Sequence, residues 1–237
     1  GGGMDQAISL GAKDHSAAKV SFNPIRLQHV TVPDGWCFII ADSGEVAEKS
    51  GSRQAEYNLR RTKCEEALHI ISTNLLEQGI TEGLHESYPE LCASLDTEVL
   101  LDFSENLLTA SEHRCFRHVV TEAGRVEAAV ERMLAADIRG FGDYMNASHD
   151  SLKTDYQVST EVLDELVQVA RDGGAVGARL TGAGFGGCVV ALAERRRTRD
   201  VLGALRAEYY ERRGRKNQMD ERLFIAVPSR GASVQVI

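Results

Sequence analysis

The chain has 237 residues, 43% of them hydrophobic and 26% charged, and a formal net charge of −8 at pH 7. This length and composition are typical of a globular protein with one large domain or two small ones. The acidic balance argues against binding of duplex nucleic acid, which needs clustered lysine and arginine. No apolar run reaches the roughly 18 residues that a membrane-spanning helix requires, so we expect no membrane partner.

The cysteines and histidines indicate a compartment rather than a metal site. Five scattered cysteines form no C-x-x-C pair, which favours reduced thiols and a cytoplasmic protein. Seven histidines form no H-E-x-x-H or similar spacing, which argues against a zinc site. Three glycines precede the first methionine, Met4, and are either a cloning remnant or part of a longer sequence.

The amino-terminal third predicts one short helix, two strands and one long helix. Residues 4–10 place apolar side chains one helical turn apart. The segments 18–22 and 36–41 predict strands, separated by a Pro-Asp-Gly turn at 33–35. A helical pattern then extends from about residue 54 to 76.

The middle of the chain predicts mainly helices. Residues 82–110 contain helical pieces interrupted at Pro89. Apolar residues recur on one face over 122–137 and again over 159–171, which predicts two amphipathic helices.

The carboxy-terminal part predicts strands on either side of a glycine-rich loop. The flanking strands are 176–181 and 188–193, and a helix at about 200–212 precedes a last strand pair, 223–227 and 233–237. Strands near both ends with helices between them indicate an α+β fold, an antiparallel sheet with helices on one side.

The glycine-rich loop, residues 181–187, reads TGAGFGG. Gly182, Gly184 and Gly187 satisfy G-x-G-x-x-G, but a dinucleotide site requires a helix after the loop, and here an apolar strand follows. We therefore predict a hairpin or bulge. Its glycines can expose backbone N–H groups to an anion, although a tight structural turn is the simpler interpretation of the loop alone.

Asp5 lies in the first turn of the predicted amino-terminal helix, where the helix dipole favours an ionised carboxylate. Such a carboxylate could accept a proton from a substrate hydroxyl. On this segment alone, an acid that only complements the dipole is the simpler interpretation.

The segment 57–67 places several charges on a predicted helix. Arg61 and Glu65 are i, i+4 neighbours, and such pairs add only about 0.2–0.5 kcal/mol, so we expect mostly solvated charges, Arg60 included. Tyr57 could line a sugar site, though packing is the commoner role of a tyrosine. His149 could act as an acid or base, but a hydrogen-bonded structural histidine is the simpler interpretation.

Five separated segments resemble galactokinase and occur in that family's order. The resemblance covers nearly the whole chain. The segments are GGGMDQ at 1–6, YN-x-RR-x-x-CE at 57–65, RHVVTE at 117–122, SH-x-SL-x-x-DY-x-VS at 148–159 with LDEL at 163–166, and GARLTGAGFGGC at 177–188.

The resemblance implies the carboxy-terminal lobe of a GHMP-type kinase that transfers the γ-phosphoryl group of ATP to the anomeric hydroxyl of galactose. In that family the aspartate of the Met-Asp-Gln segment, here Asp5, faces the sugar O1 as base or electrostatic partner. The glycine three positions earlier, here Gly2, contacts the sugar through its backbone, and the tyrosine before the Arg-Arg pair, here Tyr57, lines the sugar pocket. The loop beside the reacting phosphate corresponds here to Gly182, Ala183, Gly184, Phe185 and Gly186.

Two early family segments, similar to Pro-Gly-Arg-x-Asn-Leu-Ile-Gly-Glu-His and Gly-Leu-Ser-Ser-Ser, do not occur in this sequence. The resemblance implies that residues 1–32 end the amino-terminal lobe, that 33–237 form the carboxy-terminal domain, and that the chain is incomplete. We expect the ligands of Mg²⁺ to lie in the missing amino-terminal half, a further partner. Phosphoryl transfer relies on such charge-neutralising groups, so we expect little activity from this chain alone.

The sugar and the role of the chain have alternatives. The first segment together with residues 22–26 resembles the N-acetylgalactosamine kinase branch, whereas Tyr57 and the pair Arg60 and Arg61 favour galactose. A non-catalytic sugar sensor with the same fold is a further alternative. The chain also departs from the family at Asp42, where an asparagine is usual; this carboxylate either alters the local charge or hydrogen-bonds the loop.

Overall fold

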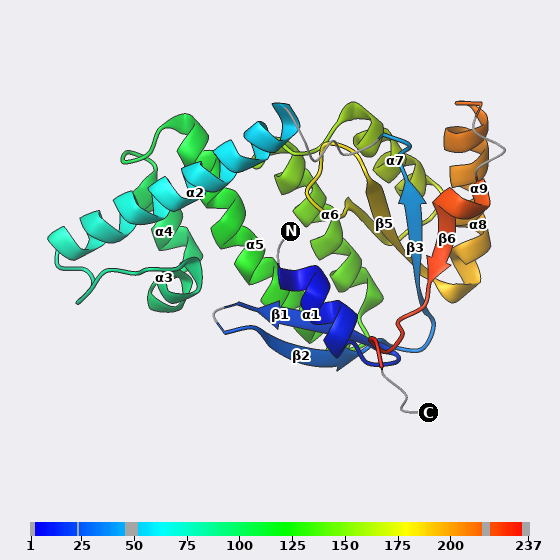
Figure 1. Cartoon of the computed structure of the whole chain (residues 1–237), viewed down its shortest axis with the longest axis horizontal. Coiled ribbons are helices and arrows are strands. Elements are labelled where there is room, and N and C mark those ends of the chain that lie inside the picture. Colours follow the sequence, from blue (N-terminus) through cyan, green and yellow to red (C-terminus); the bar gives the residue numbers. More distant parts are fainter. Residues whose placement is uncertain (1–2, 23, 46–51, 215–218, 234–237) are drawn as a thin grey trace.

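The computed structural model of the chain describes residues 3–22, 24–45, 52–214 and 219–233 (Figure 1). Its first elements are α1 (Gly3–Gly11), β1 (Ser16–Ser21), β2 (Arg26–Thr31), β3 (Trp36–Asp42), α2 (Ser52–Glu77), α3 (Tyr88–Ser94), α4 (Thr97–Ser104), α5 (Ala110–Leu134) and α6 (Ile138–Thr154). The remaining ones are α7 (Glu161–Asp172), β4 (Gly177–Leu180), β5 (Cys188–Glu194), α8 (Thr198–Ala204), α9 (Met219–Arg222) and β6 (Leu223–Ala226), with a 3₁₀ turn at Arg195–Arg197 and a π-helical segment at Leu205–Glu211.

The main sheet is antiparallel, with strand order β4-β5-β3-β6, so the expected α+β fold is confirmed. Side chains alternate along β3, and Cys37, Ile39 and Ala41 share one face. That face packs against α7 and α8, whose buried contacts include Leu166 and Val201.

The opposite face of β3 carries its aromatic residues. Trp36 packs edge-on against Phe141 of α6, with ring centroids 5.1 Å apart, and Phe38 lies 6.5 Å from the same ring. Met133 of α5 and Val30 of the β1–β2 hairpin belong to the same apolar cluster. The hairpin is therefore held to the main sheet through α5 and α6.

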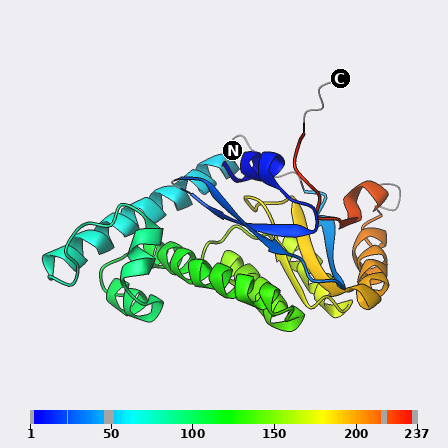
Figure 2. The ribbon, with the colours of Figure 1, turned by 90° about the horizontal axis from the view of Figure 1, so that it is seen from below.

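Helices α2 to α5 have a second core that is separate from the sheet. Leu91 and Leu100, from α3 and α4, pack with Ile71 of α2 and Phe116 of α5. Figures 1 and 2 show that these helices extend away from the sheet along the longest axis of the molecule. The long helix α5 contributes to both cores and so joins the two parts.

The predicted helices and strands differ from the observed ones at several ends. Strand β2 and helix α6 were not predicted. Strand β2 was missed because exposed polar residues alternate with more buried ones along it. The predicted start of α5 at 122 is wrong, since Thr109 forms a capping box with Glu112 and starts the helix twelve residues earlier. Pro89 lies in the first turn of α3, where its missing N–H is tolerated, so it begins a helix and does not interrupt one. The strand expected at 233–237 lies almost wholly outside the described residues.

A partly buried polar network joins α5, α6 and the sheet. Glu122 accepts hydrogen bonds from Ser148 (2.5 Å), Arg125 (2.7 Å) and Arg179 (3.2 Å). One turn earlier on α5, His118 lies 3.0 Å from the hydroxyl of Ser151. Burial lowers the pKa of His118 to about 4, so this ring is neutral in the folded protein near neutral pH.

The buried His118 predicts acid sensitivity. Below its ordinary pKa of 6.5 the unfolded chain binds a proton that the folded ring does not accept until about pH 4, so stability is lost as pH falls through this window. At about 1.4 kcal/mol per pKa unit, the loss between about pH 7 and pH 5 is roughly 2 kcal/mol. Urea unfolding at both pH values should show a pH dependence that is weaker by this amount in His118→Gln. Equal pH dependence in the two proteins would contradict this assignment.

Candidate functional site

The glycine-rich loop connects β4 to β5 as an antiparallel hairpin, so the Rossmann alternative is excluded by geometry. Thr181 N–H donates to the carbonyl of Cys188 (2.9 Å) at its base. Backbone φ angles are positive at Gly182 (82°), Gly184 (81°) and Phe185 (58°), as well as at the two glycines that follow. A residue with a side chain is strained at a positive φ angle, which explains why the loop contains so many glycines.

The loop is docked against the segment that follows α6. Phe185 N–H donates to the carbonyl oxygen of Val158 at 2.7 Å. A Cβ atom at Gly184 would lie 2.7 Å from Val158 Cβ and closer still to the carbonyl oxygen of that residue. Because any side chain there would displace Val158, only glycine allows this close backbone contact.

The tip of the loop leaves backbone donors available. Among the described residues, no acceptor contacts the N–H groups of Gly182, Ala183 or Gly186. Gly182 and Ala183 are exposed. Consecutive free N–H groups in a turn of this kind can bind an anion such as a phosphate.

Arg60 of α2 links the helix to the loop. Its Nε donates to the carbonyl of Tyr156 (2.6 Å) and its Nη2 to the carbonyl of Gln157 (2.7 Å). The guanidinium also lies over the ring of Phe185, 5.0 Å from its centroid. The expected solvated charge is therefore wrong for Arg60, whose side chain is 15% exposed, whereas Arg61 is 73% exposed and pairs with Glu65.

His149 is a structural histidine, as the simpler interpretation had it. Its Nδ1 accepts from the N–H of Leu180 (3.4 Å), the last residue before the loop, and its Nε2 lies 3.3 Å from Asp164. Burial lowers the pKa of His149, so the neutral ring can accept on one nitrogen and donate from the other. The ring thereby holds the end of β4 against α6 and α7.

Two of the predicted sugar-binding residues, Asp5 and Tyr57, lie near the amino-terminal ends of helices α1 and α2. Asp5 is exposed in the first turn of α1, and no described residue forms a hydrogen bond or ion pair with it. Figures 1 and 2 both show the amino-terminal end of α1 next to the loop between β4 and β5. Tyr57 is 39% exposed on α2, one turn before Arg60, and Gly2 lies outside the described residues.

Asp42, the departure from the family pattern, hydrogen-bonds the loop that follows β3. Its Oδ1 accepts from the N–H of Gly44 (2.6 Å) and from Arg222 (2.9 Å). The added negative charge is thus compensated by an arginine from α9.

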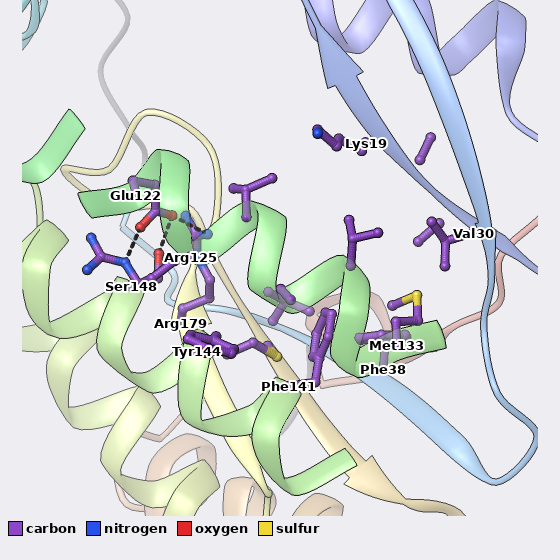
Figure 3. Close-up of a pocket in the computed structure, with 17 residues that line it drawn as sticks. Lys19, Val30, Phe38, Glu122, Arg125, Met133, Phe141, Tyr144, Ser148 and Arg179 are labelled. Carbon is purple, nitrogen blue, oxygen red and sulfur yellow. Dashed lines mark hydrogen bonds and ion pairs between the residues drawn. The ribbon is translucent and has the colours of Figure 1, made fainter. Parts of the chain in front are cut away.

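A separate cavity of about 290 Å³ lies between the β1–β2 hairpin and helices α5 and α6 (Figure 3). Its walls are mainly apolar, and the network around Glu122 closes one end. Neither Asp5, Tyr57 nor the glycine-rich loop lines it. The sequence offered no signal for this cavity because its lining comes from segments far apart in the chain.

Comparison with known proteins identifies the family. Residues 126–211 match the family described as GHMP kinases C terminal. The chain is 37% identical over 197 residues to a galactokinase of Halalkalibacterium halodurans and 33% identical over 233 residues to a galactokinase of Mannheimia succiniciproducens. The chain therefore contains a GHMP kinase C-terminal domain.

The resemblance of the chain to galactokinases, inferred from its sequence, is thereby confirmed. The two alignments cover 80% and 97% of this chain and 45% and 55% of those proteins. The structure of Lactococcus lactis galactokinase complexed with galactose matches with a TM-score of 0.79 at 28% identity, over 98% of this chain and 55% of that one. The chain thus spans about half the length of the curated relatives it matches.

Two further properties concern the part of the chain that the structure describes. None of its helices is long and apolar enough to cross a lipid bilayer. No group of three His, Cys, Asp or Glu side chains within it is arranged to hold a metal ion.

The docking of the loop predicts unequal effects of two alanine substitutions. Gly182→Ala meets open space and carries only the strain of a positive φ angle, about 1–2 kcal/mol. Gly184→Ala has the same strain and also collides with Val158, so it should destabilise by at least about 2 kcal/mol more. Urea unfolding of both variants measures the difference, and equal losses would show that the loop is not packed on Val158.

Proposed function

We propose that this chain carries part of the active site of a sugar 1-kinase that transfers the γ-phosphoryl group of ATP to the anomeric hydroxyl of galactose. The observation that supports this most directly is the position of the glycine-rich loop. In Figures 1 and 2 the loop lies next to the amino-terminal end of α1, the helix that carries Asp5, and the N–H groups of Gly182 and Ala183 have no acceptor among the described residues. An anion-binding turn beside an exposed carboxylate is the arrangement that transfer of phosphate to a hydroxyl needs.

Asp5 is proposed to orient the sugar O1 and to accept its proton or stabilise its developing charge. The carboxylate is suited to this because it is exposed and no described residue competes for it. Gly2 and Tyr57 are proposed to contact the sugar, the first through its backbone and the second through its ring.

The glycine-rich loop is proposed to lie against the reacting phosphate. During phosphoryl transfer, charge accumulates on the oxygens of the transferred group, and fixed N–H donors stabilise it without reorganisation. Gly182, Ala183, Gly184, Phe185 and Gly186 supply the backbone of this turn. Because Arg60 and Val158 hold the turn from behind, the donors are fixed before the phosphate binds.

We further propose that residues 1–32 belong to a substrate- and ATP-binding lobe and that 33–237 form the carboxy-terminal domain. The boundary falls between β2 and β3, which belong to different sheets. ATP would serve with Mg²⁺, whose ligands we expect outside this sequence, together with the segment that cradles the phosphates. We expect the protein to be cytoplasmic, and this chain alone should be a poor catalyst.

The substrate alternatives are N-acetylgalactosamine, favoured by the resemblance of residues 22–26, and a sugar bound without turnover. An assay of ADP release by the product of the complete reading frame, with each of the two sugars, decides among the three. Turnover with galactose supports the proposal, and turnover with only the acetylated sugar corrects the substrate. Sugar binding without ADP release would establish a sensor.

Asp5→Asn tests the assigned chemistry. Loss of a positioned acid or base usually costs about 10²–10⁴-fold in rate, and we expect a fall of that size in kcat with retained sugar binding. Asp34→Asn, at an exposed aspartate in the turn before β3, is a matched control that should keep full activity. Undiminished turnover in Asp5→Asn would remove Asp5 from the mechanism.

A further inference from the structure

The cavity between the β1–β2 hairpin and helices α5 and α6 lies where the main sheet is incompletely packed (Figure 3). On the sheet face toward α7 and α8, Ile39 of β3 and Val189 of β5 are fully buried. Their neighbours on the opposite face, Phe38 and Val190, line the cavity and are only half-buried. Protein interiors are normally close-packed. A mainly apolar cavity of about 290 Å³ is at the lower end of the volumes of small-molecule sites, so it can hold a small ligand.

Each helix forms its part of the wall with a single apolar face. Helix α5 contributes Val126, Val130 and Met133, and α6 contributes Phe141 and Met145. Side chains three or four positions apart lie on the same side of a helix, so these residues form continuous apolar surfaces. Such walls favour an aliphatic chain or an aromatic ring over a sugar, because the hydroxyl groups of a sugar would lose hydrogen bonds to water without replacement.

The charges in the wall of the cavity do not balance. Glu122 is the one acidic residue among the described residues of the wall, and it pairs with both Arg125 and Arg179. Lys19, the third cation of the wall, pairs with Glu127, which lies outside it. The two arginines therefore share one carboxylate, and one positive charge remains that no described carboxylate compensates.

Both guanidinium groups keep donors for a ligand. Arg125 donates from Nε to Glu122 (2.7 Å) and from Nη2 to the hydroxyl of Thr121 (2.9 Å). Arg179 donates from Nε to the carbonyl of Leu180 (3.1 Å) and from Nη1 to Glu122 (3.2 Å). Within the described part of the chain, no acceptor contacts Nη1 of Arg125 or Nη2 of Arg179. Guanidinium N–H groups of this kind bind carboxylates through strong, charge-assisted hydrogen bonds.

We propose that this cavity binds a small monocarboxylate whose body is apolar, either an aliphatic chain or a single aromatic ring. The carboxylate accepts hydrogen bonds from Arg125 and Arg179, and the body lies against the apolar walls. Figure 3 shows Glu122 and Arg125 at one end of the cavity and Val30 and Met133 toward the other, so the two parts of the ligand have separate places. A monoanion matches the single uncompensated charge, whereas a dianionic phosphate ester exceeds it. This inference does not depend on the proposed kinase activity.

NMR of the methionine methyl groups tests binding at this place. Of the four methionines, Met133 and Met145 line the cavity, whereas Met4 and Met219 do not. The full chain, labelled with ¹³C at these methyl groups, is titrated with octanoate. We expect saturable shifts of the Met133 and Met145 signals, while those of Met4 and Met219 stay in place. Octanamide has the same chain length without the charge, so it should bind at least about tenfold more weakly.

Two substitutions in α5 separate the apolar part of the site from its charge. Ala129→Phe fills the cavity from the helix wall and should abolish binding of both compounds, whereas Ala123→Phe, at an exposed position outside the wall, should not. Arg125→Gln should weaken octanoate binding by about tenfold or more and leave octanamide binding unchanged. Arg132→Gln, on the same helix but outside the wall, should bind both compounds like the unchanged chain.

Equal affinity for octanoate and octanamide would show an apolar cavity without carboxylate recognition and would overturn the proposal. The absence of saturable shifts at Met133 and Met145 would overturn it as well. The methyl spectrum before titration shows whether each variant is folded. If a variant is not folded, the comparison of the two compounds on the unchanged chain still decides the outcome.

Discussion

The contacts of the Arg60 guanidinium hold the proposed site together. Two of its N–H groups donate to the carbonyls of Tyr156 and Gln157, and its flat face covers the ring of Phe185. Hydrogen bonds from a charged donor each contribute about 1.5–3 kcal/mol. Only a planar, multiply donating cation can make these contacts at once, which is why lysine would not replace it.

The glycine-rich loop can hold its unusual backbone because the structure around it is rigid. The carbonyl oxygen of Val158 accepts a hydrogen bond from the N–H of Phe185. The ring of His149 accepts one from the N–H of Leu180 and so fixes the end of β4. The apolar contacts of the sheet with α7 and α8 lie behind both. The N–H groups at the tip, which contact no acceptor among the described residues, are therefore held in place by the elements around them, as the proposed anion site requires.

Local patterns predicted much of this fold, and contacts between distant segments explain the rest. The hairpin at 181–187 was predictable because an apolar strand follows the glycines, and α1 because its apolar residues recur at helical spacing. The role of Arg60 was not predictable from periodicity, which relates only i, i+3 and i+4 neighbours, whereas its acceptor at Tyr156 is 96 positions away. Strand β2 was missed because half of its residues are polar and exposed.

Hydrogen exchange of the backbone amides, followed by mass spectrometry, tests most directly whether Arg60 holds α2, segment 156–158 and the loop as one unit. Arg60→Ala should accelerate exchange in the peptides that contain Val158 and Phe185, because the carbonyl and ring contacts are lost together. Arg61→Ala, at an exposed neighbour on the same helix, should leave both peptides unchanged. If Arg60→Ala accelerates exchange in neither peptide, the loop is held by other contacts and the central claim is wrong.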